Sequence, residues 1–399
     1  MVVPPAPTHA QIPAGVVTLA DHEACAQARL DANAWAYFSG GAADEITLRG
    51  NHSAWQQWQL HPRVLRNLSG GHTCTSLLGR KLAHPIFLAP VAYQCMAHPD
   101  GELATACAAS AQEAGMVLST QSSTLLETVA KAVTGDADRG PLWFQLYMTH
   151  DRGFTRELVQ RAERAGFEAL VVTVDAPVNG ARDRERRAGF CLPPGVSAVN
   201  LAGLPPAPAR ALSQGQSALC DGLLHSAITW ADIAWLLSQT RLPVLLKGVM
   251  HPDDALQAVQ LGMAGLIVSN HGGRTLDTAP SSAAVLPRIR QAVGADLPLL
   301  VDGGIRRGTD VLKAVALGAN AVLIGRPYIY GLANAGALGV AHVLRLLRDE
   351  LEIAMALCGC STLADVTSDC LFDGGPEFKP NFHQQSLRTH ANKNYSHLQ

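Results

Sequence analysis

The sequence predicts an α/β protein that folds as a (β/α)8 barrel, a TIM barrel. Eight short apolar runs alternate with amphipathic stretches between about residues 84 and 330. The runs are too short for helices and apolar throughout, as expected for parallel strands buried on both faces. Several amphipathic stretches end at a glycine, which favours the positive φ of a helix C-terminus. Eight alternations favour a closed barrel over an open doubly wound sheet, which uses about five or six strands.

The eight apolar runs are expected to be the barrel strands. In chain order they are Ile86–Val91, Met116–Ser119, Leu142–Tyr147, Ala169–Val174, Val244–Lys247, Leu266–Ser269, Leu299–Val301 and Ala321–Ile324. Helical patterns between them include Phe154–Ala165, Pro252–Leu261 and Thr309–Leu317, which end at Gly166, Gly262 and Gly318.

Three further segments complete a single domain that we expect to span residues 1–399, with the barrel at about 84–358. An N-terminal helical cap at about 16–83 contains a helix that ends near Gly40 and an extended segment around Leu60–Leu68. A stretch rich in Pro, Gly, Ala and Ser follows the fourth strand, from Ala181 to about Ser226. Connections this long are usually functional or disordered, so we interpret it as a lid. An extended C-terminal arm is expected at about 367–399.

The composition gives no sign of a nucleic-acid or membrane partner. The formal net charge is -2 and the isoelectric point is near 6.7, so no strongly basic face is required. No run approaches the roughly 20 apolar residues that span a bilayer, and the N-terminus lacks the pattern of a signal peptide. The nine cysteines have no zinc or CxxC spacing, which predicts reduced thiols in a cytoplasmic protein without a bound metal.

Polar residues gather where the predicted strands end, which is where barrel active sites are built. The strand ends carry Ala92 and Tyr93, Ser119 and Gln121, Gln145 and Tyr147, Thr173, Asp175 and Arg182, Lys247, Ser269 to Arg274, Asp302 to Arg306, and Gly325 with Arg326. Nearly every group suited to acid–base or anion chemistry therefore falls at one rim of the barrel.

The last two strand ends suit a phosphate group. Loops after the seventh and eighth strands often form a phosphate site in barrels. Gly304 and Gly325 allow close approach of the backbone, and Arg306 and Arg326 supply charge in a forked geometry. A DGG turn alone is also typical of simple loop closure, but the paired GRP sequence favours phosphate binding.

Two residues at the rim have competing interpretations. Lys247 ends an apolar strand, and it could be a surface lysine, a Schiff-base nucleophile of an aldolase, or a cation beside a flavin ring. His271 could be a buried structural histidine, but it follows Asn270 and precedes two glycines at a strand end, which favours a role in chemistry.

These residues together resemble the FMN-dependent 2-hydroxy-acid dehydrogenases, a family that includes glycolate oxidase, lactate oxidase, mandelate dehydrogenase and the flavin domain of flavocytochrome b2. The resemblance covers about residues 16–366. It rests on Tyr37-Phe38 with GGAADE, and on APVAYQCMAHPDGE, FQLY, TVDAP, LKGV, VSNHGGR-x-LD, VDGGIRRGTDVLKA and IGRP. SNHGGR followed by DGGIRRG is the most specific part.

The resemblance implies roles for individual residues. It implies His271 as catalytic base, Asp175 as its partner, and Tyr147 as a hydrogen-bonding group for the substrate hydroxyl. It implies Tyr37, Arg182 and Arg274 as ligands of the substrate carboxylate, with Gln121 beside the substrate. It implies FMN as cofactor, held by Ala92, Ser119, Gln145, Thr173, Lys247, Ser269, Asp302, Gly304, Arg306, Gly325 and Arg326.

The implied reaction is oxidation of an (S)-2-hydroxy acid to the 2-keto acid, with the flavin reoxidised by O2 to give H2O2. Reoxidation by a quinone or another carrier, and oxidative decarboxylation as in lactate monooxygenase, are the alternatives. The resemblance also implies a homotetramer or homo-octamer. Two departures concern specificity: Gln121 replaces a tryptophan of glycolate oxidase-like members, and Arg182 replaces an adjacent arginine pair. Ala92 beside the flavin favours the oxidase.

Overall fold

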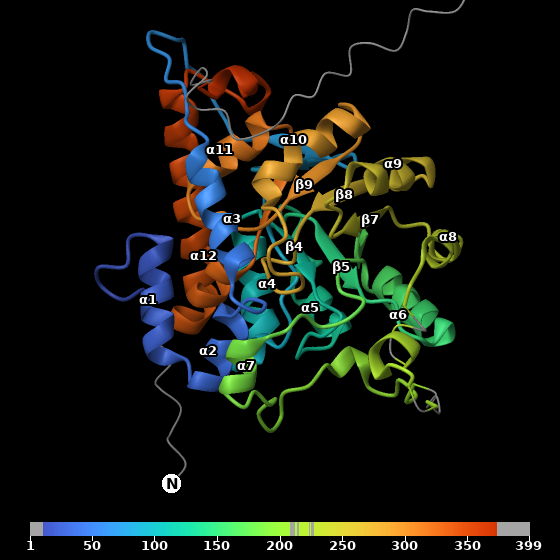
Figure 1. Ribbon diagram of the computed structural model, residues 1–399. Helices are drawn as coiled ribbons and strands as arrows, with labels where there is room; N and C mark the ends of the chain where they lie inside the picture. Colours follow the sequence, from blue (N-terminus) through green and yellow to red (C-terminus); the bar gives the residue numbers. More distant parts are fainter. Residues whose placement is uncertain (1–10, 208–211, 214, 223, 225–226, 373–399) are drawn as a thin grey trace, which may run out of the picture.

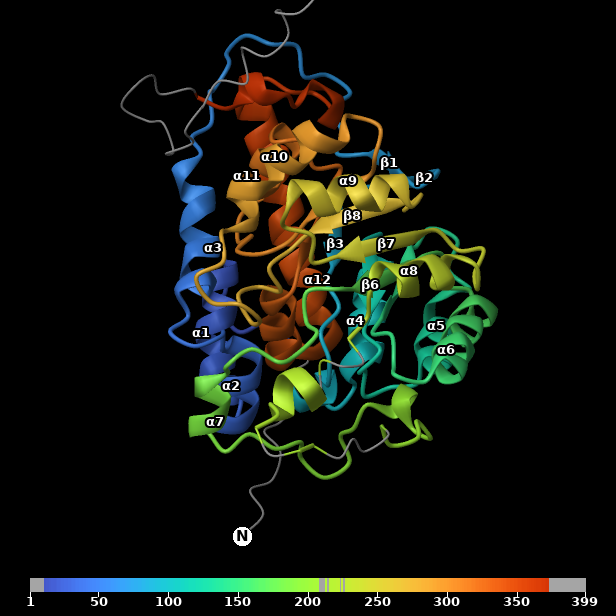
Figure 2. The same ribbon diagram turned by 45° about the vertical axis from the view of Figure 1, so that its right-hand side comes forward.

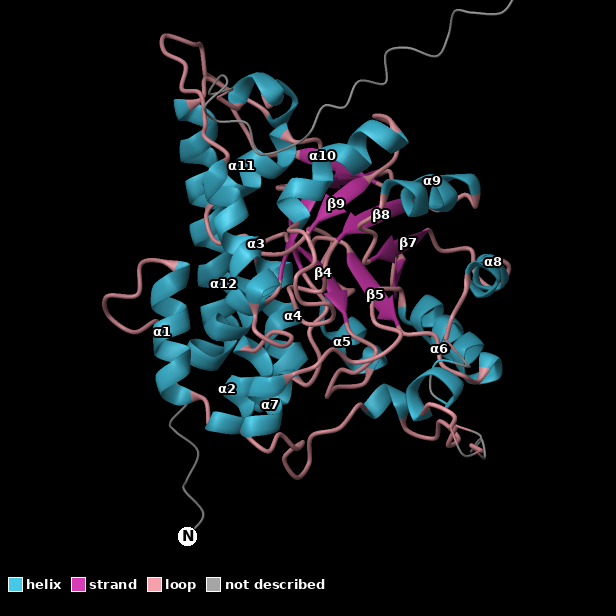
Figure 3. Cartoon of the chain, viewed as in Figure 1, coloured by secondary structure: helices cyan, strands magenta, loops and turns pink. Residues whose placement is uncertain are grey.

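The computed structural model contains the predicted barrel and describes residues 11–207, 212–213, 215–222, 224 and 227–372. Eight parallel strands close in the order β10-β3-β4-β5-β6-β7-β8-β9, surrounded by helices (Figures 1 and 3). The strands are β3 Ile86–Leu88, β4 Gly115–Leu118, β5 Leu142–Leu146, β6 Leu170–Thr173, β7 Val244–Lys247, β8 Gly265–Val268, β9 Leu299–Val301 and β10 Ala321–Ile324. Every residue of these eight barrel strands is buried.

Three of the eight strands, β7, β9 and β10, have the predicted bounds, and the other five differ from the predicted runs by one to three residues. The largest difference is at β3, which ends at Leu88 although the apolar run continues to Val91. Ala89 still donates to the Ile324 carbonyl, but Pro90 has no N–H with which to continue the ladder. Beyond this point the chain is free to turn across the barrel mouth.

The barrel interior is filled by side chains. Phe87, Val117, Trp143, Val171 and the corresponding residues of the other strands form one buried cluster inside the ring. Leu77 and Leu82 belong to the same cluster and come from the hairpin of β1 (Thr75–Leu77) and β2 (Arg80–Leu82). This hairpin therefore closes the N-terminal end of the barrel.

The helices cover the outside of the ring. They are α4 Gly101–Ala111, α5 Leu126–Val133, α6 Arg152–Ala165, α8 Trp230–Leu237, α9 Pro252–Gln260, α10 Ser282–Val293, α11 Gly308–Ala316 and α12 Arg326–Leu357. The predicted glycine terminators are confirmed, since Gly166, Gly262 and Gly318 have φ of 88°, 82° and 102°. The helix α12 is long and apolar enough to cross a membrane, but it is kinked at Ala335–Gly336 and mostly buried against α1, α4 and α11.

The N-terminal cap consists of α1 Leu19–Arg29, α2 Ala32–Ser39 and α3 Ile46–Gln57, which lie along one side of the barrel (Figures 1 and 2). The end of α2 matches the predicted helix end near Gly40. The segment around Leu60–Leu68 was predicted to be extended. It contains no strand apart from the bridge of Leu60 with Leu371, and it bends at Leu65, whose φ is 58°. Of the predicted C-terminal arm at about 367–399, the described residues 367–372 include a short 3-10 helix at Ser368–Cys370, and the remainder lies outside the described residues.

The helix α3 was not predicted, because its sequence contains Gly50 and its N-cap Glu45 makes no side-chain capping bond. Tertiary contacts hold it instead. Asn51 exchanges two hydrogen bonds with Asn270, and the Trp55 indole donates to the Gly303 carbonyl at 2.8 Å. The helix thus packs on the loops that follow β8 and β9.

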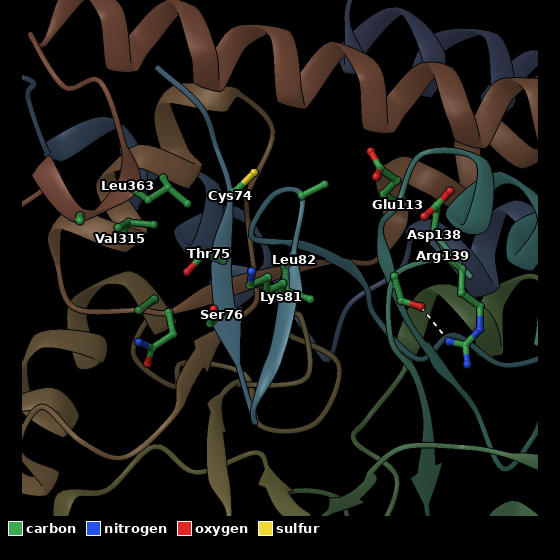
Figure 4. A pocket seen from close by; sticks show the side chains of 15 residues that line it. Cys74, Thr75, Ser76, Lys81, Leu82, Glu113, Asp138, Arg139, Val315 and Leu363 are labelled. Carbon is green, nitrogen blue, oxygen red and sulfur yellow. Dashed lines mark hydrogen bonds between the residues drawn. The ribbon is translucent and has the colours of Figure 1, made fainter. Parts of the chain in front are cut away.

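A cavity of about 800 Å3 lies beside the β1–β2 hairpin, at the N-terminal end of the barrel (Figure 4). Its polar groups are spread over opposite walls, with Cys74 and Lys81 on the hairpin and Glu113 and Asp138 across from them. Barrel active sites are built at the other end, on the loops after the strands. The larger cavity is therefore not the candidate site.

Candidate active site

A second cavity, of about 510 Å3, lies at the C-terminal ends of the strands. Its lining includes every sequence-predicted site residue except Asp175 and Ser269. The predicted residues in the lining are Tyr37, Ala92, Ser119, Gln121, Gln145, Tyr147, Thr173, Arg182, Lys247, His271, Arg274, Asp302, Gly304, Arg306, Gly325 and Arg326. Residues from all eight strand ends, from the cap and from the lid thus converge on one space of ligand size.

His271 and Asp175 form an acid–base pair at one wall. The Nδ1 atom of His271 lies 2.8 Å from Oδ1 of Asp175, which is two residues past the end of β6. An ionised carboxylate fixes the proton on Nδ1, so the Nε2 atom carries the lone pair. Burial lowers the pKa of His271 below its usual 6.5, and Asp175 offsets only part of that effect. His271 is therefore a neutral base at pH 7.

Gly248 allows Asp175 to approach the histidine. Its φ is +111°, and a Cβ atom added there would lie 2.4 Å from Cβ and 2.6 Å from Cγ of Asp175. A side chain at this position would push the carboxylate out of line. Gly248 follows Lys247 at the end of β7 and was not singled out from the sequence.

Replacing Gly248 with alanine is expected to slow reduction of the bound flavin by about ten- to a hundredfold, because small misplacements of catalytic groups carry costs of this order. Rapid-mixing measurement of flavin reduction under anaerobic conditions tests this. Gly262→Ala is the matched control, since its φ of +82° adds the same backbone strain but no atom lies within 4 Å of the new Cβ. Equal rates in the two variants would show that Gly248 does not position Asp175.

Lys247 is a buried cation and not a free amine. Its Nζ atom lies 3.3 Å from Oδ2 of Asp302 and donates to Oγ of Ser269 at 3.0 Å. Burial by itself would lower the pKa of Lys247, but the carboxylates of Asp302 and Asp175 more than offset this, and the net pKa is raised. A Schiff-base lysine needs an unprotonated amine, so the aldolase interpretation loses its support.

Ser269 does not line the cavity, although it was predicted to bind the cofactor. Its side chain is fully buried, where the Oγ atom also accepts a hydrogen bond from the backbone N–H of His271 at 3.1 Å. Ser269 therefore holds Lys247 and the His271 backbone in place from below. Ser269 directly follows the last residue of β8, which accounts for its inclusion in the prediction.

A row of hydrogen-bonded side chains forms the floor of the cavity. The Gln145 amide donates to Oγ1 of Thr173 at 3.1 Å and accepts from Oγ of Ser119 at 3.3 Å. The parallel register sets Thr173 opposite Lys247, so these polar groups continue into the lysine cation. The result is a row of polar side chains that ends at the Lys247 cation, which suits a planar ring with polar edges.

Arg306 and Arg326, which were predicted to bind a phosphate, both line the cavity. The guanidinium of Arg326 lies close to that of Arg274, because both donate to the Gly40 carbonyl. Arg326 donates to the carbonyls of Phe38, Gly272 and Gly40, which leaves two of its five N–H groups for a ligand. Gly325 leaves open space, since an added Cβ would meet nothing closer than 3.9 Å. Gly304 has a different reason to be glycine, because a Cβ there would lie 2.1 Å from the Asn51 carbonyl oxygen of α3.

Arg274 and Arg182 lie at the near end, below the cap. Arg274 donates to the carbonyls of Tyr37 and Gly40 at 2.6 and 2.9 Å, and its guanidinium lies 4.9 Å from the Tyr37 ring. The Nε atom of Arg182 is buried without a hydrogen-bond partner. A buried unpaired N–H is costly unless a ligand accepts from it. This end of the cavity is therefore suited to a carboxylate.

Two tyrosines complete the near end. Burial raises the pKa of Tyr37 to about 12 and also raises the pKa of Tyr147. Both phenols therefore remain protonated at neutral pH and can donate hydrogen bonds to an anionic ligand or to an oxygen on its second carbon. Tyr93 also lines this part of the cavity; its backbone has φ of 56°, and its N–H donates to the Gln121 carbonyl.

The described part of the lid closes over this end. The short helix α7 (Asp183–Arg187) packs against α2, and the two lie side by side in Figures 1 and 2. Phe190 stacks on Tyr37 with ring centroids 4.9 Å apart. Glu185 accepts from Arg274 at 3.0 Å and from Arg182 at 3.4 Å. Sequence reasoning missed Glu185 and Phe190; the spacing of Glu185, three residues after Arg182, was the available signal.

Comparison with known proteins identifies the family. The family model described as FMN-dependent dehydrogenase matches residues 26–373. The chain belongs to the FMN-dependent dehydrogenase family.

Individual relatives agree with this assignment. The chain is 49% identical to an L-lactate oxidase from Alicycliphilus denitrificans over 362 residues, which covers 90% of this chain and 98% of the relative. It is 44% identical to glycolate oxidase 1 of Zea mays over 353 residues, covering 88% and 94% of the two chains. A solved mandelate oxidase with (S)-2-phenylpropionate has a TM-score of 0.79 and 41% identity, covering 89% and 98%.

These relatives establish the chain as an FMN-dependent oxidase of 2-hydroxy acids. The cavity fits FMN on its own evidence. The Oδ1 atom of Asp302 is buried without a hydrogen-bond partner and can accept from a ribityl hydroxyl. Lys247, Arg306 and Arg326 line the cavity and supply positive charge that would balance the negative charge of the reduced ring and of the phosphate of FMN. Among the described residues, no group of three or more His, Cys, Asp or Glu could hold a metal.

Proposed function

We propose that this oxidase acts on (S)-2-hydroxy acids of the size of L-lactate or larger and turns them over better than glycolate. The observation that carries the proposal is the arrangement of the near end of the cavity. Two arginines, one with an unpaired Nε–H, lie on the same side as the free Nε2 atom of His271. This arrangement can hold a carboxylate while a base faces the adjacent carbon.

In the proposed reaction Arg274 and Arg182 bind the substrate carboxylate, and the phenol of Tyr37 adds a third donor. Tyr147 donates to the C2 oxygen and keeps it near His271. The Nε2 atom of His271 takes the hydroxyl proton, and Asp175 stabilises the resulting imidazolium through Nδ1. FMN, when bound, supplies the acceptor for the C2 hydrogen with its two electrons and passes them to O2, which yields H2O2.

Gln121 supports the preference for larger acids. It lines the cavity, and its backbone is fixed by hydrogen bonds to Ser119 and Tyr93. A glutamine covers less of the site than the indole found at this position in glycolate oxidase-like members. Each additional methylene in an apolar pocket is worth about 1 kcal/mol. The L-lactate oxidase and mandelate oxidase relatives are named for substrates larger than glycolate.

The proposal is tested by mixing the flavin-loaded protein anaerobically with glycolate, L-lactate, (S)-2-hydroxybutyrate, (S)-2-hydroxyoctanoate and (S)-mandelate. We expect bleaching of the flavin by the larger acids, and one H2O2 per keto acid when air is admitted. Acetate in place of pyruvate would indicate the monooxygenase alternative, and slow reoxidation by O2 but rapid reoxidation by a quinone would indicate a dehydrogenase. Absence of bleaching by every acid would overturn the proposal.

Substituting Gln121 with tryptophan is expected to raise the ratio of kcat/KM for glycolate to that for 2-hydroxyoctanoate by about tenfold or more, because the indole removes space for a long side chain. Steady-state kinetics on both proteins measure this ratio. If the order of substrate preference does not change, Gln121 is not the selecting residue and the lid becomes the candidate.

We further propose that the enzyme is cytoplasmic and forms a homotetramer. All nine cysteines lie in the described part of the chain and are unpaired, which suits a reducing compartment. Exposed apolar side chains at Ile353, Leu357 and Leu65 support association with another copy. Light scattering of the purified protein tests the oligomeric state.

A further inference from the structure

The near end of the cavity contains an acidic side chain between the two arginines. Oε1 of Glu185 accepts from Nη2 of Arg274 at 3.0 Å and lies 3.4 Å from Nη1 of Arg182. Glu185 also lines the cavity, and its side chain is only 13% exposed. One carboxylate oxygen thus joins two guanidinium groups that would otherwise repel each other.

The three charged groups add up to a single positive charge. Arg274 is buried beside Arg182, and burial followed by the neighbouring Arg182 cation lowers the pKa of Arg274. Arg182 and Arg274 contribute two positive charges and Glu185 contributes one negative charge. A substrate with one carboxylate brings this cluster of three groups to neutrality, whereas a second carboxylate beside it adds a negative charge that none of the three balances.

The position of Glu185 is fixed by the lid and does not depend on the arginines alone. The next residues of the lid are attached to the cap, since Asn33 and Cys191 exchange two hydrogen bonds and Phe190 stacks on Tyr37. On the other side of Glu185, Arg184 pairs with Glu45 and donates to Ser39 at 2.9 Å. The carboxylate is therefore held at the cavity wall by contacts on both sides.

We propose that Glu185 is a specificity-determining residue that makes the site select 2-hydroxy acids with one carboxylate and reject those with two. The inference rests on the proposed function of this site. In a four-carbon diacid the second carboxylate lies three bonds from the first, so when the first is bound to Arg274 and Arg182 the second lies within about a Debye length of Glu185 and its repulsion is little screened. Glu185 also positions the two arginines by accepting from both.

A second interpretation of the same contacts makes a different prediction. If Glu185 only occupied the carboxylate site until substrate displaced it, removing its charge would improve binding of every acid by the same factor. Charge selection instead changes the ratio between acids with one and two carboxylates. The ratio therefore separates the two interpretations.

The test compares (S)-2-hydroxybutyrate with L-malate, which share four carbons and the same C2 centre but differ in a terminal methyl or carboxylate. Glu185→Gln keeps an acceptor oxygen for Arg274 and removes the charge. We expect the ratio of kcat/KM for L-malate to that for 2-hydroxybutyrate to rise by about tenfold in this variant, the size of one charge interaction at partly buried distances. The dependence of anaerobic flavin reduction on acid concentration gives a Kd for L-malate and for 2-hydroxybutyrate. The ratio of these two Kd values measures the same selectivity at the level of binding.

Two controls keep the result interpretable. Asp183→Asn removes the same charge from the same helix, but Asp183 pairs with Arg186 and Arg187 on the solvent side, so the ratio should not change. Glu185→Asp keeps the charge and should retain the wild-type ratio. An unchanged ratio in Glu185→Gln, or an equal gain for both acids, would overturn the proposal. If the wild-type enzyme oxidises neither acid nor L-lactate, the proposed function itself fails.

Discussion

Replacing His271 with alanine is expected to leave FMN bound and to slow its reduction by the best substrate at least about 10²- to 10⁴-fold, the usual range for loss of a general base. The Nε2 atom of the imidazole carries a lone pair that can take the proton, because Nδ1 is engaged with Asp175 at 2.8 Å. Anaerobic stopped-flow absorbance of the flavin measures the rate directly and separates it from reoxidation.

The pH dependence provides a second measure of the same group. The pKa of His271 lies below 6.5 in the folded protein, so the neutral base is present above that value and is lost as the pH falls through it. Flavin reduction should therefore stay constant from pH 8 to about pH 6.5 and decline below the pKa of His271. His251→Ala, at the exposed start of α9, is the control. A near wild-type rate in His271→Ala would show that another group takes the proton.

Arg274→Lys is expected to weaken binding of substrate and of oxalate together by about ten- to a hundredfold, the range for a lost hydrogen bond to a charged group. Three of the five N–H groups of Arg274 already bind Tyr37, Gly40 and Glu185. The remaining two are available to a carboxylate as a fork, and an ammonium group keeps the charge but cannot reproduce that geometry.

Titration of the flavin absorbance with oxalate gives the Kd without turnover. Arg186→Lys, on the exposed side of α7, is the matched control because its side chain is 71% exposed. Oxalate binding that is unchanged in Arg274→Lys would mean that Arg274 does not hold the carboxylate. A loss of flavin from the variant would instead point to a role for Arg274 in keeping the cap closed.

The barrel and most of its site were predictable because both follow from local patterns. Buried parallel strands give continuous apolar runs, and the chain can only place polar residues where those runs end. Lys247, His271 and Asp302 were identified in this way, since Lys247 and Asp302 directly follow apolar residues and His271 lies three residues past Val268. The closed order of the strands then brings all eight ends to one rim, so no long-range information was needed.

The contributions of Glu185, Phe190 and Gly248 could not be predicted in the same way, because they depend on contacts between distant segments. Glu185 and Phe190 reach the site only because α7 packs on α2, and nothing in a loop rich in small residues specifies that contact. Gly248 matters only because Asp175 approaches it from the neighbouring strand. The position of Ser269 outside the cavity lining could not be predicted for the related reason that a strand end does not show which way its side chain points.

The carbonyl groups at the end of α2 have a consequence for how this protein can change over evolutionary time. The Gly40 carbonyl accepts from both Arg274 and Arg326, and the Tyr37 and Phe38 carbonyls each accept from one of the same two arginines. These cations serve as the C-terminal cap of the helix. Exchange of the first 45 residues for a segment that ends elsewhere would leave each buried guanidinium with a single partner, Glu185 for Arg274 and the Gly272 carbonyl for Arg326, so the cap and the barrel must be inherited as one unit.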